Sequence, residues 1–575
     1  MGLTVGTAGH IDHGKTWLVR AMTGKDTDRL PEEQRRGISI ELGYAPLELP
    51  DGRQLSVIDV PGHERFVRTM VAGATGIDLF LLVVDAAEGA RPQTHEHLAI
   101  LRLLGINTGV VAVTKADSVD VETLELALEE ARELVPGAEV VAVSARTGAG
   151  LDELRTALAR AADRVEHAPA FGAMRLYIDR VFTLRGIGTV VTGTLWAGSI
   201  GEGDQLRVEP RGLDVRVRSV EVHDRAVERA TAGQRVAVAL TGVQRTALGR
   251  GEALVEPGAY PISYRLDVEL EPVADIPASV QVHHGTSETP ARVARVGETF
   301  AQLRLSQPVV AARGDRVVLR TTTTVGGGRV LDPAPPRRTS VDRLRVLANG
   351  DPAEVVRAVV DGPVTRASLA RRALLSPADL DEALQVLERA GEWYFTDDWL
   401  AGLRAGVRSR LERHAASGAI DPGLPLAELL PGEPWAAAVV DRLGVERRGA
   451  NAYLPGQAAS LGVRDGAARE VEAALAAAGV EPIAVEDREL ARYLEAEGRM
   501  VRVGDGLAVG AAAYAEARRV LVEECESAGS ITLARFRDLL GTSRRPAQLL
   551  LERFDADGIT RRVGDTRVLR RAGRA

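Results

Sequence analysis

The spacing of apolar positions changes along the chain and divides it into regions of different structure. Up to about residue 169, short apolar runs rich in β-branched residues alternate with helical patterns; the runs cover residues 56–60, 79–84, 110–114 and 140–144. This alternation predicts βαβ units around a mostly parallel sheet. In such sheets the functional loops follow the carboxyl ends of the strands. Residues 1–169 are therefore expected to form an α/β domain with its site at one edge of the sheet.

The next region consists of short alternating strands separated by glycine turns, as in residues 180–193. This pattern predicts all-β structure, and a proline-bounded break near Tyr260 divides the region in two. We expect two β-barrel domains, at 170–258 and 259–338. The proline-rich run 333–336 marks a linker behind them.

A repeated pattern fills the rest of the chain. Three helical segments followed by a short hairpin recur, and residues 495–505 align with residues 555–565 at a spacing of 60 residues. A helix that ends at glycine and continues into a hairpin is typical of a winged-helix unit. The sequence predicts four such mainly α-helical units in tandem, at 339–400, 401–456, 457–510 and 511–575.

The composition is that of a multidomain globular protein. The 575 residues include a single cysteine, Cys525, which excludes an internal disulfide and a cysteine-based zinc cluster and fits a reducing cytoplasm. No segment has the character of a signal peptide or a membrane span. We expect a cytoplasmic monomer with no membrane partner. The formal net charge is −8, yet residues 531–575 hold eleven arginines against five acidic residues, so basic charge gathers at the C-terminus.

The most informative motif is a glycine-rich loop between a strand-like and a helix-like segment, Gly9-His10-Ile11-Asp12-His13-Gly14-Lys15-Thr16. The glycines let backbone N–H groups converge on phosphates, and the expected phosphate ligands are Asp12, His13, Gly14, Lys15 and Thr16. Lys15 reaches the β- and γ-phosphates, and the Thr16 hydroxyl can ligate Mg²⁺. The loop predicts a nucleoside triphosphate and Mg²⁺ as cofactors.

A second element follows a predicted strand and reads Asp59-Val60-Pro61-Gly62-His63. Asp59 can hold Mg²⁺ through water, and the Gly62 N–H can meet the γ-phosphate. His63 is then placed to orient the attacking water, so it is the candidate catalytic residue.

The segment 36–40 lies between these two elements, where we expect a switch ordered by the γ-phosphate and Mg²⁺. Gly37 is the expected phosphate contact, and Ser39 is the hydroxyl available to the metal. The same residues also fit a simple strand entry, because Ile38, Ser39 and Ile40 alternate in polarity.

Base recognition is expected from two short runs, Thr114-Lys115-Ala116-Asp117 and Ser144-Ala145-Arg146. A carboxylate at Asp117 accepts hydrogen bonds from the guanine N1–H and exocyclic amine, which adenine cannot offer. The second run adds a backbone donor to guanine O6. The predicted cofactor is therefore GTP. The predicted fold class is multidomain, with an α/β P-loop GTPase domain, two β-barrel domains and C-terminal tandem winged-helix repeats.

The glycine-rich loop, the run at 59–66 and the two barrels resemble the translational GTPases related to elongation factor Tu. More narrowly, residues 6–16, 26–30, 36–43 and the winged-helix tail resemble the bacterial selenocysteine-specific elongation factors (SelB). This resemblance covers essentially the whole chain. It implies a ribosome-stimulated GTPase that delivers selenocysteinyl-tRNA at UGA codons and binds a hairpin of the message through its last winged helices.

The resemblance also implies roles for residues around the catalytic candidate. Ile11 and Ile38 match the hydrophobic gate of the family around His63. Ser39 and Thr114 stand where the broader family has Thr and Asn. These two departures concern the metal and base contacts rather than the activity.

A pocket for the aminoacyl group is implied in the first barrel. Asp179, Arg180 and Arg250 match the segments that form it in the family. A selenol is more acidic than a thiol or a hydroxyl, so the correct cargo carries an anion that its seryl precursor lacks. Arginines in a small pocket can select for that charge.

The basic tail is expected to bind RNA. Arg544 and Arg545 begin the third helix of the last unit, and Arg561, Arg562 and Arg567 flank its hairpin turn. Such residues can contact the phosphates of a stem while splayed loop bases are recognised.

Two other functions fit parts of the pattern. Another tRNA-carrying translational GTPase would share the barrels, but it has no reason to carry four winged helices. A DNA-binding regulator switched by the GTPase would use the tail, because winged helices more often bind DNA.

Overall fold

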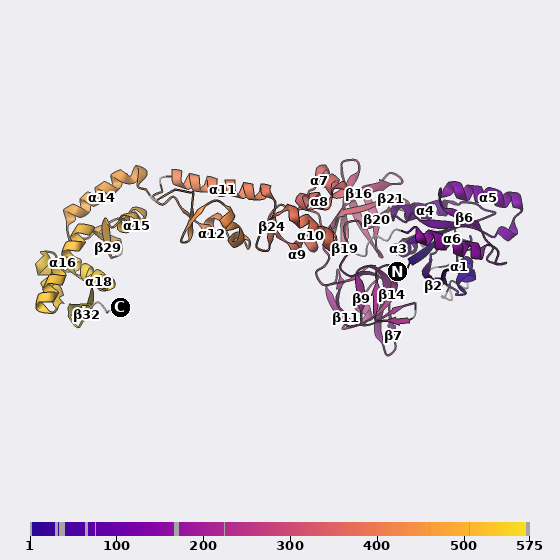
Figure 1. Ribbon diagram of the computed structural model, residues 1–575, viewed down its shortest axis with the longest axis horizontal. Helices are drawn as coiled ribbons and strands as arrows, with labels where there is room; N and C mark the ends of the chain where they lie inside the picture. The colour runs from indigo at the N-terminus through magenta and orange to yellow at the C-terminus, as the bar shows by residue number, and fades with distance from the viewer. Residues whose placement is uncertain are drawn as a thin grey trace. The chain divides into compact units, whose positions relative to one another are not determined.

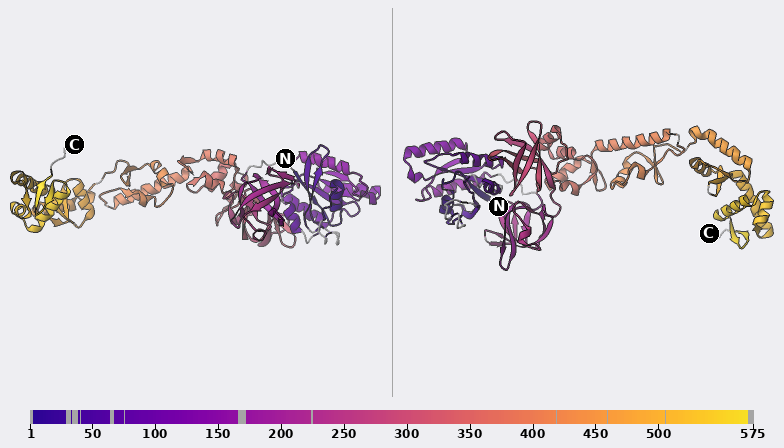
Figure 2. Two further views of the ribbon diagram at one scale, coloured as in Figure 1. Left: turned by 90° about the horizontal axis from the view of Figure 1, so that it is seen from below. Right: turned by 180° about the vertical axis from the view of Figure 1, so that it is seen from behind.

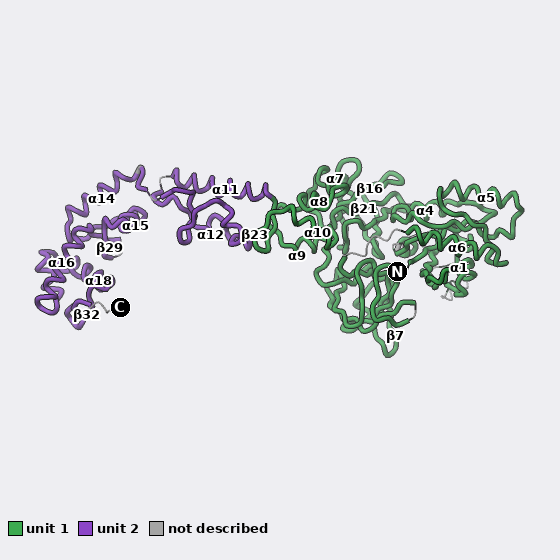
Figure 3. Tube along the Cα trace, in the orientation of Figure 1, with its two compact units in different colours: residues 1–396 green, residues 397–575 purple. Residues whose placement is uncertain are grey.

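The computed structural model describes residues 3–28, 33, 39, 41–63, 67–74, 76–165, 172–223, 225–417, 419–458, 460–504 and 506–570. The chain forms two compact units, Met1–Thr396 and Asp397–Ala575, which Figure 3 shows in different colours. Among the helices of the described residues, none is both long and apolar enough to cross a membrane.

The first domain is an α/β layer structure around a six-stranded sheet of order β2-β3-β1-β4-β5-β6. Strand β2 is antiparallel to β3, and the other neighbours run parallel. The strands are β1 (Leu3–Ala8), β2 (Gly43–Glu48), β3 (Gln54–Asp59), β4 (Leu79–Asp85), β5 (Gly109–Thr114) and β6 (Glu139–Ala142). The helices are α1 (Lys15–Thr23), α3 (Val67–Ala74), α4 (Pro92–Leu103), α5 (Val121–Leu134) and α6 (Leu151–Asp163), and a 3₁₀ turn covers Ala116–Ser118 (Figure 1).

Buried apolar side chains fill both faces of this sheet. Residues of α1 and α6 pack on one face and residues of α3, α4 and α5 on the other. Every residue of β4 is buried, as expected for a central parallel strand covered on both sides. The site loops consequently leave the sheet at the carboxyl ends of β1, β3, β5 and β6.

The second domain is a barrel in which β10, β15, β7, β8, β14 and β11 pair in a closed ring. Its strands are β7 (Arg175–Leu184), β8 (Gly188–Ala197), β9 (Ser199–Gly201), β10 (Gln205–Glu209), β11 (Leu213–Val222), β12 (Arg225–Val227), β13 (Arg229–Thr231), β14 (Arg235–Thr241) and β15 (Ala253–Val255), and Arg245–Ala247 form a 3₁₀ turn. The third domain is a closed barrel of β16 (Ile262–Pro272), β17 (Ser279–His284), β18 (Ser287–Val296), β19 (Phe300–Val310), β20 (Arg316–Arg320) and β21 (Thr324–Asp332). Figure 2 shows both barrels from two further sides.

Charged contacts join the domains of the first unit. Arg175 of β7 is buried against Asp315, with 2.7 Å between a guanidinium nitrogen and a carboxylate oxygen, and this pair holds the two barrels together. Arg320 of β20 contacts Glu96 of α4 at 2.7 Å, which fixes the second barrel to the α/β domain. The three domains therefore form one packed body.

A winged helix completes the first unit. It comprises α7 (Val341–Asn349), α8 (Pro352–Val359), β22 (Val364–Thr365), α9 (Arg366–Ala370), α10 (Pro377–Ala383), β23 (Glu388–Ala390) and β24 (Trp393–Phe395). Arg343 of α7 contacts the buried carboxylates of Asp332 and Asp267 on the barrel, at 2.5 and 3.5 Å. This winged helix is thereby anchored to the second barrel.

The described residues of the second unit form three more small sheets, each of the order first, third, second strand. Its first part comprises α11 (Asp397–Ala416), β25 (Leu424–Pro425), α12 (Leu426–Leu429), α13 (Ala436–Val439), β26 (Glu446–Arg448) and β27 (Asn451–Tyr453). The middle part comprises α14 (Asp465–Ala478), β28 (Ile483–Ala484), α15 (Arg488–Ala496), β29 (Met500–Gly504) and β30 (Leu507–Gly510). The last part comprises α16 (Ala511–Ala528), β31 (Ile531–Thr532), α17 (Leu533–Leu540), α18 (Arg544–Ala556), β32 (Thr560–Val563) and β33 (Thr566–Leu569).

The predicted fold class is confirmed. The α/β domain, the two barrels and the repeated helix-and-hairpin units all occur in the predicted order. The domain bounds given by the sequence stay a prediction.

Candidate functional site

The loop between β1 and α1 curls around the first turn of the helix. Gly14 directly precedes α1 with φ 86°, and Asp12 is also left-handed with φ 63°. The first N–H groups of a helix lack partners within it and attract anions. A Cβ at Gly62 would lie 2.9 Å from the Ile11 backbone nitrogen and 2.2 Å from the Lys15 amine, so a larger residue there would force the phosphate loop and the loop after β3 apart.

Lys15 lies inside this loop. Its amine donates to the carbonyls of His10 and Gly9, at 2.7 and 3.1 Å. Only 6% of the residue is exposed, and burial lowers the pKa of Lys15 to about 8. A phosphate group beside this amine would offset the loss of water around the charge.

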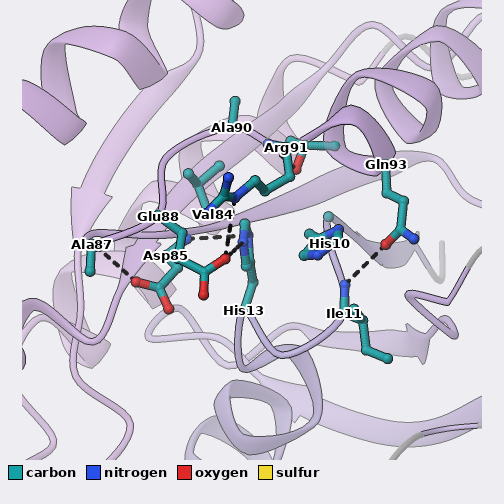
Figure 4. A network of polar contacts seen from close by, with 12 residues as sticks. His10, Ile11, His13, Val84, Asp85, Ala87, Glu88, Ala90, Arg91 and Gln93 are labelled. Carbon is teal, nitrogen blue, oxygen red and sulfur yellow. Dashed lines mark hydrogen bonds and ion pairs between the residues drawn. The ribbon is translucent and has the colours of Figure 1, made fainter.

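The segment from the end of β4 into α4 supports the loop from the other side, as Figure 4 shows for part of the contacts. The Gly9 N–H donates to His97 Nδ1 at 3.1 Å, and the Ile11 N–H donates to Gln93 Oε1 at 3.4 Å. The Asp85 N–H donates to His13 Nδ1 at 3.3 Å. Burial lowers the pKa of His97 to about 3 and lowers that of His13 as well. Both imidazoles are therefore neutral. His97 accepts a hydrogen bond through Nδ1, whereas His13 Nδ1 also lies 3.4 Å from the Val83 carbonyl oxygen.

Hydroxyl and carboxylate oxygens converge next to Lys15. The Thr16 hydroxyl donates to Asp59 at 2.7 Å and lies 2.9 Å from the Ser39 hydroxyl. The Thr27 hydroxyl donates to Asp59 at 2.8 Å, and the Ser39 hydroxyl donates to Asp28 at 2.7 Å. Hard oxygen donors of this kind are the ligands that Mg²⁺ prefers, so the cluster fits the expected metal.

The expected base-binding residues meet at the ends of β5 and β6. Arg146 contacts Asp117 at 2.6 Å, and the Ser144 side chain together with this charge lowers the pKa of Asp117. Lys115 is left-handed with φ 56° and pairs with Asp85 at 2.7 Å. The Thr114 hydroxyl lies 2.7 Å from the His13 carbonyl. Thr114 therefore ties the base-binding loop to the phosphate loop.

A second cluster lies where the first barrel meets β2. Arg235 of β14 donates to both oxygens of Asp179, at 3.1 to 3.2 Å, and its guanidinium carbon lies 3.5 Å from the centroid of the Tyr44 ring. The Thr192 hydroxyl donates to Asp179 at 2.5 Å. Although burial opposes it, the Asp179 charge raises the pKa of Arg235. These contacts hold the charged side chains in place at the boundary between the barrel and the α/β domain.

Arg180 extends this cluster toward the expected switch. It donates to the Leu42 carbonyl at 2.7 Å and contacts Glu41 at 3.1 Å. Glu41 and Leu42 lie in the sequence between Ser39, an expected Mg²⁺ ligand, and the start of β2. The residues that follow the switch thus contact the barrel directly.

The comparisons with known proteins match each part of the chain. A family model described as the elongation factor Tu GTP binding domain matches residues 2–164, and one described as the selenocysteine-specific elongation factor, beta-barrel domain, matches residues 264–337. A third, described as elongation factor SelB, winged helix, matches residues 523–569. The chain is 36% identical to the selenocysteine-specific elongation factor of Desulfomicrobium baculatum, over 99% of this chain and 100% of that protein. The chain belongs to the selenocysteine-specific elongation factors.

Other members of the family agree. The selenocysteine-specific elongation factor of Escherichia coli K12 is 33% identical over 99% of both chains. The crystal structure of a bacterial selenocysteine-specific elongation factor, EF-Sec, covers 99% of this chain and 100% of its own with a TM-score of 0.74 at 27% identity. SelB of Methanococcus maripaludis with the GTP analogue GppNHp covers 60% of this chain and 80% of its own, with a TM-score of 0.51 at 26% identity. This elongation factor is a GTPase, with GTP and Mg²⁺ as its cofactors.

Several predicted site residues of this elongation factor need separate mention. Ile11 of the phosphate loop and His63, directly after Gly62, are both half-buried. Gly37 and Ile38 lie outside the described residues. Arg250 is exposed in the turn before β15, and its place in the pocket stays a prediction. The arginine that contacts Asp179 from β14 is Arg235.

The expected RNA-binding arginines of the elongation factor differ in exposure. Arg544, Arg545, Arg561 and Arg562 are exposed on the last winged helix. Arg567 is only 7% exposed and donates to Asp555 at 2.9 Å. Its charge is engaged inside the unit, and its contact with RNA stays a prediction.

Sequence reasoning missed several residues of the elongation factor's site. Thr27 and Asp28 belong to the oxygen cluster, and both stand in the run 26–30 that carried the family resemblance. Gln93 and His97 hold the phosphate loop from α4, four residues apart on one helix face. The first half of α4 is polar throughout, so the spacing of these two residues alone does not single them out in the sequence.

Proposed function

We propose that this elongation factor carries selenocysteinyl-tRNA to the ribosome in its GTP-bound form and binds a message hairpin through its last winged helix. The observation that carries the cargo assignment is the cluster of Arg235, Asp179 and Tyr44. It combines a fixed cation with Tyr44 of β2, the strand that follows the switch segment. A site of this kind can recognise an anion and report the nucleotide state.

The nucleotide part rests on residues that act locally. Lys15 and the first turn of α1 hold the phosphates, and the oxygens of Thr16, Ser39 and Asp59 hold Mg²⁺, which stabilises charge on the phosphates when bound. Asp117 selects guanine, with Arg146 and Ser144 fixing its carboxylate. We assign these roles from geometry and donor chemistry.

Hydrolysis requires a water molecule in line with the γ-phosphate. His63 follows Gly62, the residue whose backbone closes against Lys15. We assign it the orientation of that water, with Ile11 as one wall of the gate around it. A hydrogen-bonding side chain suffices for this role, because positioning dominates in phosphoryl transfer.

Cargo selection follows from charge. A selenolate offers an anion to Arg235 and Arg180, whereas a seryl group offers only a neutral hydroxyl. Tyr44 packs against the Arg235 guanidinium and donates to Asp179 at 3.4 Å, so the cation is fixed before the cargo arrives. Loss of a preorganised cation weakens binding of the anion much more than binding of its neutral analogue.

The test is protection of the aminoacyl ester of selenocysteinyl-tRNA, compared with seryl-tRNA of the same sequence, by the full chain with a nonhydrolysable GTP analogue. We expect selective protection of the selenocysteinyl form. Arg235→Ala should weaken that protection by about tenfold or more, and the control variant Arg185→Ala, at an exposed arginine of the same barrel, should not. Equal protection of both tRNAs by the unchanged protein would contradict the proposal.

The tail is tested separately with a hairpin RNA and a duplex DNA of matched length at one salt concentration. The proposal expects tighter binding of the hairpin. Equal or tighter binding of the duplex would contradict the RNA assignment.

A further inference from the structure

Trp17 occupies an unusual position on the phosphate-binding helix. It directly follows Lys15 and Thr16 in the first turn of α1, yet 68% of it is exposed. The next two residues, Leu18 and Val19, are fully buried. An indole ring is among the largest apolar surfaces that a side chain can offer. Because this exposed ring lies next to a ligand site, contact with the bound ligand would bury it.

The direction of the ring follows from helix geometry. Side chains on a helix tilt toward its N-terminus and cover the surface over the preceding turn. For Trp17 that surface is the end of α1 where the phosphates bind. The ring is therefore expected to overlie the entrance to the nucleotide site rather than the body of the helix.

Neighbouring charges hold the ring in place. The Arg20 guanidinium carbon lies 5.6 Å from the centroid of the Trp17 ring, and Arg20 pairs with Asp26 at 3.2 Å. The Asp26 carboxylate also accepts the N–H of Asp28 at 3.1 Å. This chain of contacts links the ring to the segment that enters the oxygen cluster.

The side of the helix that Trp17 occupies points to one part of the nucleotide. Successive helix positions turn by about 100°, so Trp17 lies nearly opposite Lys15, which serves the β- and γ-phosphates. Thr16 between them faces Ser39 and Asp59. Because Lys15 and Thr16 serve the β- and γ-phosphates and the metal, the part of the nucleotide that Trp17 can contact is the side of the α-phosphate that carries the ribose.

We propose that Trp17 is a nucleotide-positioning residue whose indole packs against the ribose of the bound guanine nucleotide and slows its release. This inference rests on the nucleotide site assigned above. The ring covers the apolar C–H face of the sugar. This face takes no part in phosphate or base recognition. Trp17 thereby affects how long a nucleotide stays bound, not which base is selected.

The first experiment follows tryptophan emission of the full chain when unmodified GDP is added. Five tryptophans contribute, and a contact at Trp17 moves its emission to shorter wavelength as water leaves the ring. The GDP-dependent shift should be present in the unchanged protein and absent in Trp17→Phe. A shift of the same size in Trp17→Phe would overturn the inference.

The second experiment measures the rate of GDP release. Trp17→Ala should release GDP roughly three- to tenfold faster, the range expected for one aromatic contact. Trp17→Phe keeps a ring and should stay closer to the unchanged protein. Val121→Ala is the matched control, because Val121 is an equally exposed apolar residue, 72% exposed, at the start of α5.

The outcomes separate this inference from the nucleotide site itself. If the unchanged protein failed to bind GDP in equilibrium dialysis, the nucleotide site would be wrong. If it bound GDP normally but Trp17→Ala released GDP at the unchanged rate, only the ribose contact would be wrong.

Discussion

The Arg235 guanidinium carbon lies 3.5 Å from the centroid of the Tyr44 ring. Tyr44 lies in β2, the strand that follows the switch segment, and Arg235 is the first residue of β14 in the first barrel. Burial raises the pKa of Tyr44 above its ordinary value, so the ring stays neutral and offers its face to the cation. A movement of β2 therefore changes the surroundings of the cargo-pocket arginine.

Replacing Tyr44 should weaken cargo binding without abolishing GTP binding. Tyr44→Leu removes the ring face and should lower the affinity for selenocysteinyl-tRNA by about tenfold. Tyr44→Phe keeps the face and loses only the contact with Asp179, so we expect a smaller effect. Equal losses in the two variants would show that the ring face is not what matters. Ester protection at several protein concentrations measures both.

Asp117→Asn should change the base preference. The carboxylate that accepts two guanine hydrogen bonds is lost, so the affinity for GTP should fall by about a hundredfold or more, while xanthosine triphosphate gains a partner. Asp120→Asn is the matched control, because Asp120 caps α5 and asparagine caps helices equally well. Unchanged GTP affinity in Asp117→Asn would refute the base assignment. Competition binding of the two nucleotides checks this.

His63→Ala should abolish most hydrolysis but leave nucleotide binding intact. A positioning or general-base group contributes about 10²- to 10⁴-fold to rate. Single-turnover GTP hydrolysis on the ribosome measures this. His95→Ala, at an exposed position of α4, serves as control. Full hydrolysis by His63→Ala would rule out its assigned role.

Asp267 lies where the second barrel meets the first winged helix. It should make the stability of the protein depend on pH. Burial, together with the Asp332 charge, raises the pKa of Asp267 to about 6. A raised carboxyl pKa means that folding takes up a proton, so this contribution is present at low pH and is lost as pH rises through about 6. Asp267→Asn removes the dependence. Its stability relative to the unchanged protein should increase from pH 5 to pH 8, by about 1–3 kcal/mol.

Thermal unfolding of the full chain at pH 5 and pH 8 checks this, read as the difference between the two proteins. The difference removes the titration of all other groups that the two proteins share. A constant difference across this range would contradict the assignment.

The tail arginines should divide into two classes. Arg544→Ala and Arg545→Ala should lower hairpin affinity and reduce the salt dependence of binding, because each removes a phosphate contact. Arg567→Ala should instead lower stability, because it leaves Asp555 without its buried partner. Arg518→Ala, exposed on α16, controls for net charge. Titrations at two salt concentrations together with thermal unfolding distinguish the classes.

The sequence predicted the features that are local in the chain. The phosphate loop, the 59–63 run and the base-binding runs are contiguous, so their roles follow from spacing alone. Arg235 is 56 residues from Asp179 and reaches it only through the pairing of β7, β8 and β14. That register cannot be read from either segment.

The burial of Arg567 has a similar origin. It pairs with Ile531 in the sheet, and this register places its side chain against Asp555 rather than in solvent. A count of charges in the tail cannot distinguish it from Arg561 and Arg562. Side-chain direction in a short hairpin is fixed by its partner strand.

Helix α4 connects two contacts that lie next to each other in the sequence. Glu96 accepts a hydrogen bond from the Arg320 guanidinium of the second barrel, and His97 accepts a hydrogen bond from the N–H of Gly9 in the phosphate loop. One turn of α4 thus contacts both the second barrel and the phosphate loop. The contacts that connect the second barrel to the phosphate loop through α4 therefore do not include the switch segment 36–40.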